Sequence, residues 1–164
     1  MKSIFYSLVF LFFFSCLSFT VTAQSRASIT ISNEDNKTTM LSVDDIKALP
    51  HTTLQIKAHD EKMHDYQGVD MNLLLRKAGV TLGDSAKKTV GKYVLITASD
   101  HYSVVYALAE MDSVLSHKKI ILADEVDGKA LPSNATPFQI IATEEKIHAR
   151  MIRQVVSISV RKAL

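Results

Sequence analysis

Cysteine is nearly absent from this sequence. Cys16 is the only cysteine among 164 residues, and it lies in the apolar N-terminal stretch. If that stretch is removed during export, the remaining chain has no cysteine. Such a chain forms no disulfide bond and offers no thiolate to a metal ion or to nucleophilic attack. Disulfide-stabilised folds and enzymes with a catalytic cysteine are therefore excluded for the exported form.

An excess of charge of one sign is also missing. The formal net charge is +2, and loss of Lys2 with the N-terminal stretch brings the chain closer to neutrality. Proteins that bind nucleic acid through its phosphates need a basic surface, so the composition gives no support for that class. Neither glycine-rich phosphate-binding pattern, G-x-G-x-x-G or G-x-x-x-x-G-K, occurs. The chain has no internal repeat, and its length fits one domain.

The N-terminus has the pattern of a secretory signal peptide. Lys2 precedes an apolar run over residues 4–14, and small residues follow near position 23. These features predict a signal peptide over residues 1–23 and a single domain over residues 24–164, exported to the periplasm or secreted. The apolar run is short for a transmembrane helix, so no membrane span is expected in the mature chain. A retained anchor and lipid attachment at Cys16 are the alternatives.

Residues 91–111 are the most informative stretch of the mature chain. Residues 93–98 and 102–108 are two apolar runs rich in β-branched and aromatic side chains, and Ser99-Asp100-His101 separates them. The two runs predict a β-hairpin that is buried on both faces. The polar turn between them is the natural place for functional side chains, because a rigid sheet positions it.

Two short helices have clear start signals. Ser42 precedes Asp45 by three residues, which approximates a capping box. Asp70 precedes an apolar stripe at helical spacing that begins at Met71, and Gly79 follows it as a left-handed cap. Further strands are expected at residues 27–32, 39–41, 52–58, 120–123, 138–142 and 155–160, with some helical character at residues 81–90 and 143–153. This order indicates an α/β (α+β) fold, a mixed sheet with helices packed beside it.

The histidines are candidate metal ligands. His59 and His64 lie in the run AHDEKMHD, close to two aspartates. Imidazole and carboxylate groups bind zinc or copper, but the spacing of five residues does not place both histidines on one helix face. The run is equally typical of a solvated loop between a strand and a helix, so both interpretations stay open.

A second candidate site lies in the hairpin turn. His101 has Asp100 and Tyr102 as neighbours, and a histidine beside an aspartate can act as a base or contact a ligand. A turn histidine can equally be chosen because it tolerates unusual backbone angles. Arg150, in the charged stretch before the last strand, could bind an anion through its planar guanidinium group.

Three segments together resemble the oxidoreductase molybdopterin-binding family, which has the sulfite oxidase fold. The segments are Tyr66-Gln67-Gly68-Val69 with the helix after it, Ser99-Asp100-His101-Tyr102-Ser103 with Leu108 and Glu110 after it, and Asp127 to Leu131 followed by Pro137 to Ile141 and Arg150. They are similar to the family's aromatic-x-Gly-Val, Asp-Gly-Tyr-Ser and Gly-x-Pro-Leu segments. The resemblance covers nearly the whole mature chain and implies the sulfite oxidase fold and a molybdopterin cofactor.

The departures from the family pattern bear on function. Catalytic members carry a molybdenum-ligating cysteine on the strand where this chain has Ile56 and Lys57. His101 replaces the glycine of Asp-Gly-Tyr, and Gln139 replaces an arginine. These changes argue against sulfite oxidase chemistry and against tight pterin binding. The expected function is therefore a non-catalytic module that binds a small ligand or a protein partner at the 99–102 turn.

The sequence leaves two alternative functions open. One is an oxidoreductase that holds a pterin or metal cofactor through histidine and arginine rather than cysteine. The other is a metal carrier that uses His59, His64 and His101. Each would need the histidines to converge in the folded chain.

Overall fold

A computed structural model of the chain describes residues 27–58, 60–83 and 86–163. The expected signal peptide, Cys16 and His59 lie outside the described residues. No helix among the described residues is long and apolar enough to cross a membrane.

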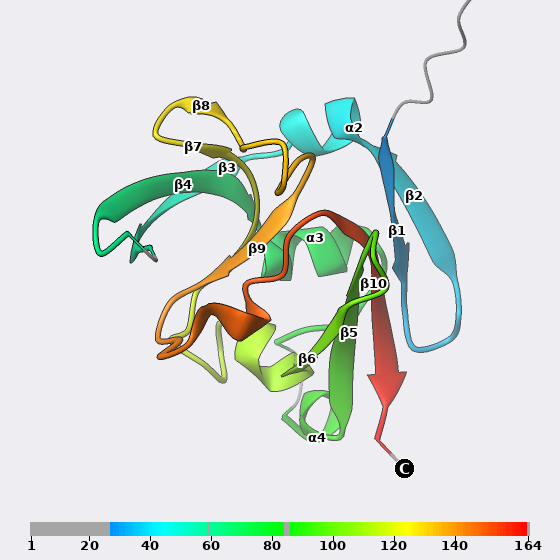
Figure 1. The fold of residues 1–164 in the computed structure, drawn as a ribbon. Coiled ribbons are helices and arrows are strands. Elements are labelled where there is room, and N and C mark those ends of the chain that lie inside the picture. The colour runs from blue at the N-terminus through cyan, green and yellow to red at the C-terminus, as the bar shows by residue number, and fades with distance from the viewer. Residues whose placement is uncertain (1–26, 59, 84–85, 164) are drawn as a thin grey trace, which may run out of the picture.

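Two five-stranded sheets make up the framework (Figure 1). The first sheet has the order β2-β1-β10-β5-β6, and its β1 and β10 run parallel whereas the other pairs are antiparallel. The second sheet has the order β3-β4-β7-β8, with β9 also paired to β7, and all of its pairs are antiparallel. The first sheet contains β1 (Ser28–Ser32), β2 (Thr38–Ser42), β5 (Lys92–Ala98), β6 (Ser103–Ala107) and β10 (Val155–Lys162); the second contains β3 (His51–Lys57), β4 (Met63–Asp70), β7 (Ile120–Val126), β8 (Lys129–Ala130) and β9 (Gln139–Ala142).

The helices are short and begin where the sequence predicts. In α2 (Val43–Lys47), Ser42 caps the N-terminus and forms the capping box with Asp45. In α3 (Met71–Lys77), the Asp70 side chain accepts a hydrogen bond from the backbone N–H of Asn72. The remaining helical segments in the described part of the chain are α4 (Ala86–Val90) and the 3-10 turns η1 (Leu108–Met111) and η2 (His148–Arg150).

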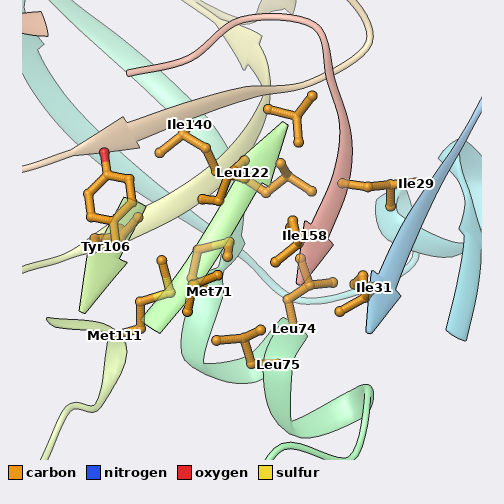
Figure 2. Packing of buried hydrophobic residues seen from close by; sticks show 14 of the residues in the cluster. Ile29, Ile31, Met71, Leu74, Leu75, Tyr106, Met111, Leu122, Ile140 and Ile158 are labelled. Carbon is orange, nitrogen blue, oxygen red and sulfur yellow. The ribbon is translucent and has the colours of Figure 1, made fainter. Parts of the chain in front are cut away.

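The main core lies between the two sheets and around α3. Met71, Leu74 and Leu75 of α3 are fully buried. Figure 2 shows them beside Ile29, Ile31 and Ile158 of the first sheet and Leu122 and Ile140 of the second. Burying an aliphatic side chain of this size contributes roughly 1.5–3 kcal/mol, so this apolar cluster is the main stabilising element of the fold.

The central hairpin is confirmed, but its expected burial on both faces is wrong. Buried and less buried residues alternate along β5 and β6, so only one face of the hairpin packs on the core. Val104 and Tyr106 point inward, whereas Val105 is 49% exposed. The reason is that β6 is an edge strand of a sheet with only one covered face. A run of apolar residues in the sequence does not show this position in the sheet.

Two further expectations need correction. The run that contains His64 was interpreted as a solvated loop between a strand and a helix, with residues 66–69 leading into that helix. Residues 63–70 instead form β4, a central strand of the second sheet. Exposed and partly buried residues alternate only over residues 63–66. Pairing with β3 on one side and β7 on the other outweighs the weak strand propensity of Asp and Gly. The charged stretch over residues 143–153 is mostly irregular, and only η2 is helical.

An ion pair links two strands of the second sheet across the strand between them. His51 of β3 places its Nε2 atom 3.2 Å from Oδ2 of Asp124 in β7, and its Nδ1 atom lies 2.7 Å from the Leu49 carbonyl oxygen. Both ring nitrogens therefore face acceptors, a geometry that suits the doubly protonated imidazolium. The Asp124 carboxylate is almost fully buried, and its Oδ1 atom has no hydrogen-bond partner among the described residues.

This pair makes stability depend on pH. Burial lowers the pKa of His51, but the hydrogen bonds to Leu49 and Asp124 outweigh it and hold the pKa above its ordinary value. A histidine whose pKa is higher in the folded state than in the unfolded state stabilises the fold at pH values below its unfolded-state pKa. This stabilisation is lost as the pH rises through its folded-state pKa. We expect His51→Gln to lower the unfolding free energy by about 1 kcal/mol in mildly acidic buffer, with a smaller loss in alkaline buffer. Urea unfolding at both pH values checks this, and an equal loss at both would contradict it.

Candidate functional site

A pocket of about 660 Å³ opens where the two sheets meet. Its floor is the face of the second sheet that points away from the main core. One wall is the β5–β6 turn of the first sheet, and the other is the segment that runs from η2 into β10. The lining includes Ile56, Asp60, His64, Tyr66, Asp100, Tyr102, Gln139, Ile141, His148, Ala149, Met151, Arg153 and Gln154.

The floor of the pocket is apolar. A small cluster separate from the main core contains Leu54, Ile141 and Met151, with Ile56 and Tyr66 packed against it. Burial raises the pKa of the Tyr66 hydroxyl, and the positive charge of Arg153 partly offsets this effect. The phenol therefore stays neutral, and its ring offers a flat apolar surface with a polar tip.

Two tyrosines hold the wall formed by η2. The Tyr102 hydroxyl donates to the Ala149 carbonyl oxygen at 3.1 Å, and the Tyr106 hydroxyl donates to the Arg150 carbonyl oxygen at 2.8 Å. Burial raises the pKa of Tyr106 far above its ordinary value, so its proton stays available for this bond. The hairpin thus positions the pocket wall through two consecutive backbone carbonyls.

The predicted anion-binding residue Arg150 takes part in an ionic cluster instead of lining the pocket. Its guanidinium group lies 4.3 Å from the centre of the Tyr106 ring and pairs with both oxygens of Glu110 and with Glu145. Lys118 pairs with the same two carboxylates. Burial raises the pKa of Glu110, but its bonds to the two cations outweigh this and hold the pKa below its usual range. We call these four charged residues the Arg150 cluster.

His64 lies on the rim of the pocket between two carboxylates. Its Nδ1 atom is 2.6 Å from Oδ2 of Asp127, and its Nε2 atom is 3.2 Å from Oδ2 of Asp60. These hydrogen bonds, the one to Asp127 first, raise the pKa of His64. Among the residues that the structure describes, no group of three or more His, Cys, Asp or Glu side chains has a metal-binding arrangement. Metal binding by His64 with His59 stays a prediction, because His59 is outside the described residues.

Of the three residues predicted as a site in and beside the hairpin turn, two line the pocket and one does not. Asp100 and Tyr102 line the pocket, and the Asp100 Oδ1 atom accepts a hydrogen bond from the Tyr102 backbone N–H at 3.0 Å. His101 has a φ of 70°, the left-handed conformation in which glycine is favoured. It is not among the lining residues. His101 therefore takes the backbone conformation that the family's glycine supplies, and a ligand contact by its side chain stays a prediction.

Arg153, Gln139 and Gln154 line the pocket but were missed as site residues. Gln139 is buried and approaches the Met151 carbonyl oxygen. Gln154 has a φ of 51°, and its Oε1 atom accepts a hydrogen bond from the Ser99 hydroxyl at 3.0 Å. Arg153 has no hydrogen bond or ion pair with any other described residue. Only the replacement of the family's arginine by Gln139 was a signal in the sequence.

Comparison with known proteins supports the fold. No described protein family and no curated protein matches the sequence. The fold is similar to that of the sulfane dehydrogenase SoxCD from Paracoccus pantotrophus, with a TM-score of 0.64 and 15% sequence identity over 82% of this chain. The predicted α/β fold of the sulfite oxidase type is therefore confirmed. The chain covers 38% of the SoxCD chain that it matches, so the likeness is to one part of a larger protein.

The lining residues do not fit the molybdenum cofactor that this fold implies. Ile56 lines the pocket on the strand where the resemblance places the ligating cysteine, and an aliphatic side chain cannot bind a metal. No described residue is a cysteine. The resemblance matches Arg150 to an arginine near the end of the family's pattern, but the Arg150 guanidinium already pairs with two carboxylates. We therefore derive no chemical step through molybdenum.

Proposed function

We propose that this chain is an exported, non-catalytic binding module that holds a small ligand in the pocket between its two sheets. The observation that carries the proposal is the pocket of about 660 Å³ with Ile56, rather than a cysteine, on its floor. Such a volume lies in the range of small-molecule sites, which are mostly apolar with a few directing polar groups. The described lining offers those polar groups but no thiol nucleophile.

The arrangement of the wall supports binding rather than a merely structural cavity. Tyr102 and Tyr106 hold the η2 segment in place, so the pocket is formed before any ligand arrives. A preformed site loses less conformational entropy on binding than a site that must be assembled. Because loops on a rigid scaffold commonly carry function, the 148–154 segment and the 99–102 turn are the expected contact regions.

Native mass spectrometry tests the proposal. The protein is purified from its own exported fraction, and its native mass is compared with its denatured mass. We expect additional mass that is lost on denaturation, with a bare chain that begins at Gln24. An organic ligand and a metal ion differ in the mass lost. A native mass equal to that of the bare chain, unchanged after incubation with small molecules from the same fraction, would overturn the proposal in favour of a protein partner.

A pocket-filling variant and a matched control variant test whether the ligand lies in this pocket. Ala149 is exposed and lines the pocket, so Ala149→Trp is expected to remove the bound mass and leave the fold intact. Ala107 is an exposed alanine at the end of β6 and is not a pocket residue. Ala107→Trp should therefore keep the bound mass. Equal retention by both variants would place the ligand elsewhere and contradict the pocket assignment.

A further inference from the structure

Some charged side chains that line the pocket interact with another group, and others have no ion-pair partner among the described residues. Asp60 and His64 pair with each other, and His148 already interacts with another group. Arg153 and Asp100 have no ion-pair partner among the described residues, although both line the same pocket. One positive and one negative group are therefore open to a ligand.

The two open groups differ in the ligand atoms they can bind. The guanidinium of Arg153 offers a planar set of N–H donors that matches a carboxylate. Arg153 lines the same pocket as Tyr66 and Ile141. The Asp100 carboxylate uses its Oδ1 atom to accept the Tyr102 backbone N–H, which leaves Oδ2 as an acceptor for an ammonium group.

Apolar side chains also line the pocket. Ile56, Ile141 and Met151 lie on the floor, and the rings of Tyr66 and Tyr102 are part of the lining. A ligand that matches this surface has an apolar body as well as two charges of opposite sign. A simple anion would leave Asp100 unmatched, and a simple cation would leave Arg153 unmatched.

We infer that the pocket binds a small zwitterion of the amino-acid type, with its carboxylate on Arg153, its ammonium on Asp100 and its apolar side chain on the floor. This inference rests on the proposed function and names the chemical class of the ligand. It involves only binding, and no bond is made or broken.

Calorimetric titration of the mature protein with L-phenylalanine, L-leucine and L-methionine tests the inference. Two analogues of phenylalanine separate the two charges, because the N-acetyl form lacks the ammonium and the amide lacks the carboxylate. We expect at least one of the amino acids to bind, and its N-acetyl and amide forms to bind about tenfold or more weakly, since each loses one charge-assisted contact.

Two conservative variants assign the charges to residues. Asp100→Asn keeps an oxygen that can accept the Tyr102 N–H, and it should remove the preference for the free amino acid over its N-acetyl form. Arg153→Gln should remove the preference for the free amino acid over its amide. Arg161→Gln, which makes the same change at an exposed residue of β10 outside the pocket, should leave both preferences unchanged.

The outcomes separate this inference from the proposed function. If none of the three amino acids binds, or if the N-acetyl form binds as well as the free amino acid, the zwitterion inference is overturned. A ligand mass lost on denaturation would then still support the binding module with a ligand of another class. If the preferences persist in both pocket variants, the assignment to Asp100 and Arg153 is overturned.

Discussion

Gly68→Ala is expected to lower the free energy of unfolding by about 3 kcal/mol, because the backbone of β7 leaves no room for a Cβ atom at this glycine of β4. A Cβ atom on residue 68 would lie 2.2 Å from the Leu122 carbonyl oxygen and 2.4 Å from the Ala123 Cα atom. Both are backbone atoms, so no side chain can rotate to relieve the overlap. The pairing register also shifts here, between Gln67 and Gly68, so the strands would have to separate at an existing irregularity.

Two other glycines provide controls for the same change. Gly91 has no atom within 4 Å of its added Cβ, so Gly91→Ala should leave stability nearly unchanged. Gly128 also has open space but a φ of +70°, so Gly128→Ala should show the cost of backbone strain alone, about 1 kcal/mol. Urea unfolding of the three variants by circular dichroism measures the ranking. A loss at Gly68 no larger than that at Gly128 would show that the close approach does not limit the fold.

Local signals explain why much of the fold could be predicted from the sequence. The caps at Ser42 and Asp70 depend on residues two or three positions away, and both are present in the structure. The hairpin turn at residues 99–101 is similarly local. By contrast, β4 was missed because its strand character comes from pairing with β3 and β7 on either side, which the polar letters of residues 63–67 do not indicate.

The pocket shows the same limit at the level of single side chains. Arg150 and Arg153 are three residues apart in one charged stretch, and no local pattern distinguishes a pocket residue from an ion-paired one. Arg150 meets Glu110, which is 40 residues away, whereas Arg153 lines the pocket. The difference depends on how the chain turns after η2, so it could be known only from the folded structure. Asp100 and Tyr102 lie at the pocket because they belong to the hairpin turn, which is a local feature.

Glu145→Gln is expected to lower the free energy of unfolding by about 2 kcal/mol and to loosen the η2 wall of the pocket. The side chain of Glu145 is only 10% exposed and lies between Lys118 and Arg150. The neutral amide would leave two cations to share Glu110 alone, both of them near the Tyr106 ring. The expected loss is below that for a fully buried ion pair because Arg150 is 34% exposed, and solvent screens its charge.

The neighbouring residue makes the same chemical change without the same contacts. Glu144 is exposed, so Glu144→Gln should change stability by less than about 0.5 kcal/mol. Hydrogen exchange then separates a local from a global effect. In Glu145→Gln, the amides of residues 148–154 should exchange faster than they do in the wild-type protein, and the increase should be larger than for the amides of β5 and β10. The reason is that the Arg150 cluster holds this segment against the hairpin. Faster exchange throughout the chain, or none in this segment, would mean that the cluster does not position the pocket wall.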